Sequence, residues 1–274
     1  MSREIDELEV GLCWGSLQKA SLPELMDTAG RHGFPTLSVR PGDFDAALKS
    51  GLSEAQLRRR LADAGVRARV IDAIGGALPG QPAASATDNE EACYRTAEAL
   101  GAPIVNLNHY RGGPVTRAEL VDAIGGICRR AAGRGLQIVL EFVPDTGLGS
   151  LVEAFAVVQG VGERNCTILL DPWHLARSGG TLEEVQGLPP GALGALQLCD
   201  RTAPPPGTAY VPMSGRDLPG EGELPLCEIV RAALANNPDL TAEVEVFSDE
   251  LRGLSIDAAA ARIATSVKAW RASC

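Results

Sequence analysis

The stretch CTILLDPWHLARSGG, residues 166–180, holds an apolar run that ends in an acid, Asp171, with His174 three residues later. Near-continuous apolar runs of this length are typical of strands in a parallel sheet that is buried on both faces. Similar runs recur along the whole chain. They predict eight strands, over residues 9–14, 36–41, 67–72, 103–108, 136–143, 166–171, 192–200 and 240–247.

Signals for helix starts alternate with these runs. In a capping box, Ser or Thr is followed three residues later by Glu or Gln, and the two side chains satisfy free backbone N–H groups at the helix start. One capping-box pair follows each of the first six runs and predicts a helix there, namely Ser21/Glu24, Ser53/Gln56, Thr87/Glu90, Thr116/Glu119, Ser150/Glu153 and Thr181/Glu184. After the last two runs, a seventh and an eighth helix are expected over residues 224–237 and 256–272.

The number of strand–helix units decides the fold class. Eight units in 274 residues amount to about 34 residues each, close to the size of a (β/α)₈ barrel. We therefore predict an α/β fold, a TIM barrel of eight parallel strands, with a single domain over residues 1–274. A doubly wound open sheet is the alternative, but the segment CWGSLQKAS after the first run lacks the glycine-rich turn of that fold. The longest irregular segments, 75–89 and 201–223, both follow expected strands on the face where such barrels carry their active sites.

Composition narrows the class of protein. The formal net charge is −10 and the pI is about 4.9, which disfavours nucleic acid and anionic membranes as partners. No apolar run reaches the roughly 18 residues of a membrane span, and MSREIDELEV lacks the features of a secretory signal. Seven cysteines without a CxxC motif favour reduced thiols over disulfides. A cytoplasmic enzyme that acts on a small molecule is the expectation.

Four polar residues stand near the C-terminal ends of successive expected strands: Glu141, Asp171, Gln197 and Glu245. In a barrel this position indicates catalytic residues. Three carboxylates that converge in a low-dielectric mouth repel one another, and a divalent cation relieves that repulsion. An all-oxygen ligand set favours Mg²⁺ or Mn²⁺ over zinc. Glu243 shares a face with Glu245, and only one of the two is expected to bind the ion.

Each of these residues also has a plainer interpretation. Asp171 could cap the following helix, although Thr181/Glu184 offers that helix a better start. Gln197 could bind a neighbouring loop, and His174 could be a packed core histidine. Arg216 could pair with acids on the surface instead of clamping a substrate. Four polar residues at matching depth on four neighbouring strands make the joint plain interpretation the weaker one.

Other residues on the same face are expected to shape a substrate pocket. The chain is poor in aromatic residues, yet several of them lie at or just past strand ends, which favours an apolar wall around a few fixed polar groups. The arginine fork suits a carboxylate, phosphate or hydroxyl of a substrate. The expected substrate contacts are Trp14, Trp173, His109, Arg177 and Arg216.

The segments LEFVP, LLDPWHLARSGG, LQLCD, GRDLPGEGELPL and EVEVFSDEL resemble the sugar phosphate isomerase/epimerase superfamily with the xylose isomerase-like barrel. The resemblance covers the fifth to eighth strands and their loops. It implies one divalent metal ion, Mn²⁺ or Mg²⁺ before Co²⁺ or Zn²⁺, bound by Glu141, Asp171, Gln197 and Glu245. It also implies that His174 contacts the substrate. Many members carry histidine where this chain has Gln197, whereas members that resemble 3-dehydroshikimate dehydratases use glutamine.

The expected reaction is proton abstraction next to the carbonyl of a sugar, cyclitol or keto-polyol, with an enediolate that the metal stabilises. Glu141 and Glu245 are the expected base and acid. This gives isomerisation or epimerisation, and loss of a β-hydroxyl with His174 as acid gives dehydration as the alternative. An endonuclease-type DNA repair barrel and a non-catalytic binding barrel are the less favoured classes. By resemblance, a homodimer is also expected.

Overall fold

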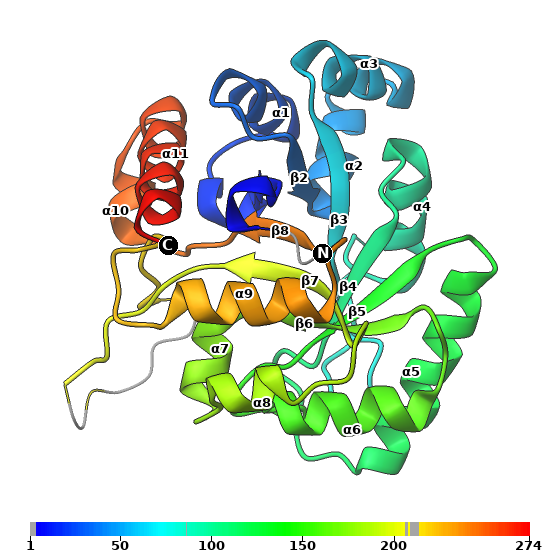
Figure 1. Ribbon diagram of the computed structural model, residues 1–274. Coiled ribbons are helices and arrows are strands. Elements are labelled where there is room, and N and C mark those ends of the chain that lie inside the picture. Colours follow the sequence, from blue (N-terminus) through cyan, green and yellow to red (C-terminus); the bar gives the residue numbers. More distant parts are fainter. Residues whose placement is uncertain (1–3, 86, 206–207, 209–213) are drawn as a thin grey trace.

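A computed structural model describes residues 4–85, 87–205, 208 and 214–274. Its strands form a closed barrel in the order β1 to β8, with every neighbouring pair parallel and the helices outside (Figure 1). The predicted TIM barrel is therefore confirmed. The strands are β1 Val10–Leu12, β2 Thr36–Val39, β3 Arg67–Ile74, β4 Ile104–Asn108, β5 Gln137–Glu141, β6 Cys166–Leu170, β7 Leu193–Leu198 and β8 Thr241–Val244.

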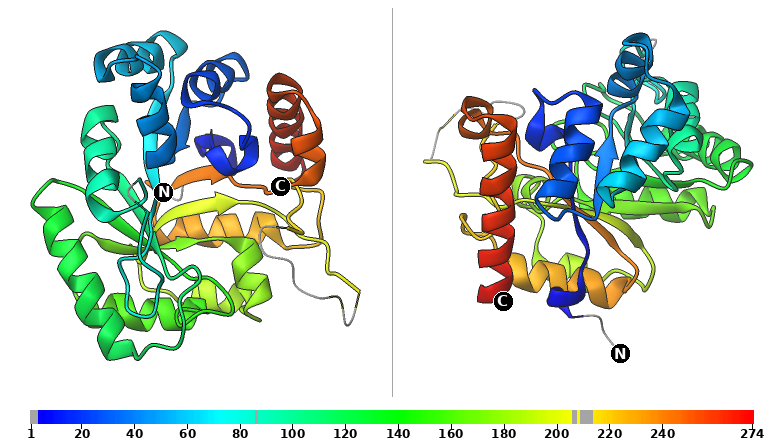
Figure 2. Two further views of the ribbon diagram at one scale, coloured as in Figure 1. Left: turned by 180° about the vertical axis from the view of Figure 1, so that it is seen from behind. Right: turned by 90° about the horizontal axis from the view of Figure 1, so that it is seen from above.

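The helices surround the sheet on all sides, and α11 at the end of the chain lies beside α1 at its start (Figure 2). In the described part of the chain, none of the helices is both long and apolar enough to cross a membrane. The helices are α1 Leu22–Arg31, α2 Pro41–Lys49, α3 Glu54–Ala64, α4 Glu90–Leu100, α5 Arg117–Ala132, α6 Leu151–Val161, α7 Pro172–Arg177, α8 Leu182–Gln186, α9 Leu226–Asn236, α10 Asp249–Gly253 and α11 Ile256–Ser273, with short 3-10 turns η1 Ile5–Glu7 and η2 Trp14–Leu17.

Most of the predicted helix starts are found. Complete capping boxes form at the starts of α1, α3, α5 and α8, and Ser150 caps α6 by accepting from the Glu153 amide. The prediction of a box at Thr87/Glu90 is wrong. Asn89 caps α4 instead and accepts from the Ala92 amide at 2.9 Å.

An apolar layer fills the interior of the barrel. Five strands contribute one buried side chain each, namely Val70, Ile104, Val139, Leu169 and Ala195. Side chains of a strand alternate between its two faces, so the residue two positions further along points to the same side. For all five strands that residue is polar. The interior is therefore apolar in the middle and polar at the C-terminal ends of the strands.

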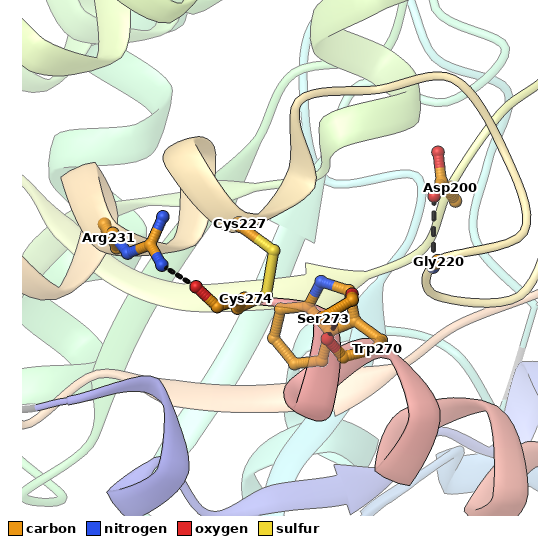
Figure 3. Close-up of a disulfide and its surroundings, with 7 residues drawn as sticks. All are labelled: Asp200, Gly220, Cys227, Arg231, Trp270, Ser273 and Cys274. Atoms are coloured by element: carbon orange, nitrogen blue, oxygen red, sulfur yellow. Dashed lines mark hydrogen bonds between the residues drawn. A yellow bond between two sulfur atoms is a disulfide. The ribbon is translucent and has the colours of Figure 1, made fainter.

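A disulfide joins Cys227 in the first turn of α9 to Cys274, 47 residues later (Figure 3). The expectation that all cysteines are reduced is wrong at this pair. The pairing has no local motif because it depends on how the end of α11 meets the start of α9. A hydrogen bond from the Arg231 guanidinium to the Cys274 carbonyl reinforces the same junction. The other five cysteines are free and buried.

Replacing Cys274 with serine is expected to lower the free energy of unfolding by about 2–4 kcal/mol, because the crosslink restricts the unfolded chain. Urea unfolding followed by circular dichroism measures this change. Dithiothreitol should bring the wild-type protein down to the value of the variant and leave the variant unchanged. A wild-type transition that does not respond to dithiothreitol would contradict the prediction.

Candidate functional site

A ring of buried polar side chains lies directly above the apolar layer. The members on or directly after β3 to β7 each stand two residues beyond a residue of that layer, and the member that follows β8 comes two residues after Glu243. The ring consists of Asp72, Asn106, Glu141, Asp171, Gln197 and Glu245. The structure therefore brings together all four residues that were predicted to bind a metal.

Glu141 uses its two oxygens differently. Oε2 accepts hydrogen bonds from Asn106 Nδ2 at 2.7 Å and from Asn108 Nδ2 at 3.1 Å. Oε1 lies 3.2 Å from His174 Nε2, which is itself 3.4 Å from Arg216 Nη2. Burial alone would raise the pKa of Glu141, but the hydrogen bond and charge of His174, with the hydrogen bond from Asn106, lower it below its usual value. Oε1 of Glu141, whose neighbour is His174, is therefore the oxygen that can accept a further partner.

Asp171 is both a helix cap and a member of the site. Its Oδ1 accepts the backbone N–H groups of Trp173 at 2.7 Å and His174 at 3.1 Å, and the Cys199 thiol at 3.1 Å. The prediction that Asp171 is not needed as a cap is therefore wrong, because α7 begins directly after it. Its Oδ2 lies 2.6 Å from Arg216 Nη2. Burial raises the pKa of Asp171, but the charges of Arg216 and His174 and the hydrogen bonds from Arg216 and Cys199 together outweigh it and lower the pKa to about 2.

The two oxygens of Glu245 also have different partners. Its Oε1 accepts from Gln197 Nε2 at 3.0 Å and from the Cys13 thiol at 3.3 Å. Its Oε2 lies 3.3 Å from Arg216 Nη2. Burial raises the pKa of Glu245 well above its usual value, even though the charge of Arg216 opposes this shift. The structure thus joins Glu245 to Asp171 through one nitrogen atom.

Glu243 is buried below the ring and does not line the cavity at the strand ends. Burial and then the charge of Asp72 raise its pKa well above the usual value. Of the two glutamates that could serve as the ligand on the eighth strand, Glu245 is the one that faces the other carboxylates.

Arg216 enters the site from the long loop after β7. The backbones of Asp200 and Asp217 form an antiparallel bridge with two hydrogen bonds of 2.9 Å, which fixes the loop on either side of the arginine. The Trp173 indole donates to the Gly215 carbonyl at 2.7 Å. The guanidinium carbon lies 4.6 Å from the Trp173 ring centroid and 5.2 Å from that of Phe247. Arg216 is therefore a fixed cation whose side chain is only 2 % exposed.

The glycines of the segment GRDLPGEGELPL are needed to fold this loop. The Asp200 carboxylate accepts the amides of Gly220 and Leu224, both at 3.1 Å, and Figure 3 shows the first of these bonds beside the disulfide. A Cβ on Gly222 would lie 2.3 Å from Asp200 Oδ1, which no side chain can do, and Gly220 has a positive φ of 80°. This motif holds Arg216 in the site through the turn that follows it.

A cavity of about 250 Å³ opens above the ring. Aromatic side chains form its walls, and its polar floor includes the catalytic candidates Glu141, His174 and Glu245. Its volume lies near the small end of ligand pockets, as suits a compact substrate. A larger open hollow of about 870 Å³ lies between α1 and α3, away from the strand ends. The aromatic walls are Trp14, Tyr110, Trp173 and Phe247.

Three of the five predicted substrate contacts, Trp14, Trp173 and Arg216, line this cavity, and two do not. His109 is fully buried, with Nε2 2.8 Å from the Pro79 carbonyl oxygen and Nδ1 accepting from the Gly147 amide. Arg177 lies behind the Trp173 ring, 5.1 Å from its centroid, and bonds to Asp145. His109 directly follows β4 and Arg177 ends α7, so both lie at the end of the barrel that carries the site. Tertiary packing turns their side chains away from the cavity.

Asp72 is a site residue that was not singled out from the sequence. It lines the cavity and accepts from Trp14 Nε1 at 2.8 Å and from Asn106 Nδ2 at 2.7 Å. Burial and then the charge of Glu141 raise its pKa to about 6. The period of two from Val70 in the apolar layer is the signal that could have found it.

The oxygens that accept no backbone, amide or thiol hydrogen bond fit a divalent ion. They are Glu141 Oε1, which lies beside His174, and Asp171 Oδ2 and Glu245 Oε2, which both lie beside Arg216. Gln197 Oε1 joins them, because it is buried and has no hydrogen-bond partner among the described residues. Hard oxygen donors suit Mg²⁺ and Mn²⁺.

The possible ligand atoms fall into two buried groups. In each group these atoms lie within 4.8 Å of one another, with Glu141, Asp171 and His174 in one and Cys13, Asp72 and Glu245 in the other. Arg216 links the two groups, because its Nη2 contacts both Asp171 and Glu245.

Comparisons with known proteins agree with this fold. The family model described as "Xylose isomerase-like TIM barrel" matches residues 26–273. No curated protein sequence matches the chain. Among solved structures, the IolI protein with a bound zinc atom is similar with a TM-score of 0.81 and 18% identity, covering 97% of this chain and 98% of that one.

Two further structures have the same architecture. The probable 3-DHS dehydratase AsbF from Bacillus anthracis has a TM-score of 0.73 and 16% identity over 95% of this chain and 98% of that one. The D-psicose 3-epimerase from Clostridium cellulolyticum H10, solved with D-tagatose, has a TM-score of 0.70 and 14% identity over 97% and 99%. At these identities, the likeness shows the fold.

Proposed function

This chain belongs to the xylose isomerase-like TIM barrel family, and we propose that it is a divalent-metal-dependent isomerase or epimerase. Its substrate would be a small sugar, cyclitol or other keto-polyol, in which the enzyme moves a proton on the carbon next to the carbonyl. Structural relatives that are described as an epimerase and a probable dehydratase support this class of reaction.

One observation carries the proposal. Glu141 and Glu245 reach the same small cavity from β5 and from the end of β8, which lie three strands apart in the barrel. Each has one oxygen that accepts two hydrogen bonds from the protein. The other oxygen has a single neighbouring nitrogen, of His174 for Glu141 and of Arg216 for Glu245. Two carboxylates that approach one substrate from different sides can remove a proton on one face and return it on the other.

A divalent ion bound by Glu141, Asp171, Gln197 and Glu245 would supply Lewis-acid polarisation of the substrate carbonyl. The residues of the chain supply the rest. The carboxylate of Glu141 or of Glu245 holds the proton that leaves the carbon. Trp14, Trp173 and Phe247 shield that proton from bulk water, so that it can be returned to the substrate.

Dehydration is the second candidate, and the position of His174 favours it. His174 lines the cavity, with Nε2 3.2 Å from Glu141 Oε1, so an acid stands beside a base. A proton delivered from Nε2 to a β-hydroxyl would allow it to leave as water. Gln197 at the position where many relatives carry histidine points in the same direction.

Solvent deuterium exchange tests the proposal. Protein treated with EDTA and then supplied with Mn²⁺ is expected to place deuterium on the carbon next to the carbonyl of at least one keto-sugar, as seen by proton NMR. Exchange should stop with EDTA and in Glu141→Gln. Loss of water would instead give a conjugated product that absorbs in the ultraviolet. If a panel of keto-pentoses, keto-hexoses and cyclic hydroxyketones shows neither exchange nor dehydration with Mn²⁺, the proposed function is wrong.

A further inference from the structure

We propose that Arg216 is an internal cation that closes the metal position, so that a divalent ion binds only as Arg216 withdraws from Asp171 and Glu245. The inference rests on the proposed metal-dependent function and adds how the ion gains access. It would make Arg216 a residue that sets metal affinity, in addition to any contact it makes with a substrate.

The hydrogen bonds of Asp171 leave an ion only one place to bind. Oδ1 already accepts two backbone N–H groups and the Cys199 thiol, and it is the cap of α7. An ion must therefore bind Oδ2, which lies 2.6 Å from Arg216 Nη2. The positively charged guanidinium and a metal ion repel each other and compete for the same oxygen.

Glu245 imposes the same restriction. Its Oε1 accepts from Gln197 and Cys13, so Oε2 is the oxygen left for an ion. This oxygen is 3.3 Å from the same Nη2 atom of Arg216. One nitrogen thus stands at the point where the free oxygens of two predicted ligands meet. The ion and Nη2 cannot both occupy that point.

Arg216 is held in a way that permits withdrawal. All the polar contacts described above are made by Nη2, whereas its buried Nε has no hydrogen-bond partner in the described part of the chain. The flat guanidinium lies against the rings of Trp173 and Phe247, contacts that permit sliding without loss of a directed bond. The cavity that it lines gives it a place to move into.

The site therefore has two states, one with Arg216 between Asp171 and Glu245 and one with the metal ion in that position. A ligand that binds only the minor state has its apparent affinity reduced by the fraction of that state. Removing the guanidinium should therefore tighten metal binding. If Arg216 instead supported the ligands, its removal would weaken binding.

Calorimetric titration of EDTA-treated protein with Mn²⁺ tests this. Arg216→Met, which keeps an apolar chain between the two rings, is expected to bind Mn²⁺ at least about tenfold more tightly than the wild type, within the usual range of such couplings. Arg216→Lys, which keeps the charge, should lie between the two. Glu141→Gln should weaken binding in every background, which locates the ion at this site.

A second measurement covers the case in which Arg216→Met does not fold. In a Trp14→Phe/Trp270→Phe protein, Trp173 is the remaining tryptophan. Mg²⁺, which does not quench by itself, is expected to change the Trp173 emission because the guanidinium leaves the face of its ring. A Trp173 signal that stays constant while Mg²⁺ binds would overturn the inference.

The outcomes separate this inference from the proposed function. If the wild type binds Mn²⁺ and Arg216→Met binds it equally or more weakly, the inference fails and the metal-dependent function stands. If only Arg216→Met binds Mn²⁺, Arg216 does close the site, and the metal dependence of the wild type is refuted. If no form binds Mn²⁺, both are wrong.

Discussion

Replacing Glu245 with glutamine should lower kcat by about 10³-fold, the range expected when a positioned acid or base is lost. Glutamine keeps the shape of the side chain, but its amide can neither hold the transferred proton nor offer a charged oxygen at the position of Oε2. Steady-state kinetics on whichever keto-sugar shows deuterium exchange measures the effect, with Mn²⁺ present in excess so that weaker metal binding does not limit the rate.

Glu243→Gln is the matched control. It is the same substitution two residues earlier in the chain, on β8, at a buried side chain that does not line the cavity. Its kcat should remain within a few-fold of the wild type. Equal losses in the two variants would mean that the barrel interior as a whole is disturbed, and full activity of Glu245→Gln would remove Glu245 from the mechanism.

Replacing Asp171 with asparagine should lower the free energy of unfolding by about 3–5 kcal/mol in EDTA, the usual cost of breaking a buried ion pair by removing one partner. The new side chain would still cap α7 through its carbonyl oxygen. Its amide nitrogen would, however, face the Arg216 guanidinium, whose side chain is 2 % exposed. Urea unfolding measures the loss. Asp257→Asn removes an Asp from an exposed pair with Arg31 and should leave the midpoint nearly unchanged.

The difference in unfolding free energy between the wild type and Asp171→Asn should depend on pH. Because the folded protein lowers the pKa of Asp171 from 3.8 to about 2, the stability it contributes is fully present above the unfolded pKa. It is lost as the pH falls through the folded pKa. The advantage of the wild type over Asp171→Asn should therefore stay constant above about pH 4 and shrink towards about pH 2. A constant difference across this range would show that Asp171 and Arg216 are not paired as charges.

Much of the architecture could be predicted from the chain alone, because the signals are local. Buried parallel strands need apolar runs, and helix starts need side chains that bind free N–H groups, so both leave short-range patterns in the sequence. The same holds for the polar ring: Glu141, Asp171 and Gln197 stand two residues beyond the apolar layer, and Glu245 two residues beyond Glu243, because alternate residues of a strand share a face. Asn89, two residues after Thr87, is the residue that caps α4.

The remaining features depend on contacts between residues far apart in the chain. Arg216 meets Asp171 across 45 residues because the bridge between Asp200 and Asp217 sets the path of its loop. Cys227 meets Cys274 only where α9 and α11 converge. His109 has the right position but the wrong surroundings, since Pro79 and Gly147 bind both of its ring nitrogens.

The barrel and its ring of polar side chains can thus be predicted from the sequence, because hydrogen bonding and side-chain alternation act over a few positions. The position of the Arg216 cation among those side chains cannot be predicted in this way. Arg216 reaches Asp171 and Glu245 only through the packing of a distant loop against the strand ends, and no short-range pattern in the chain records that packing.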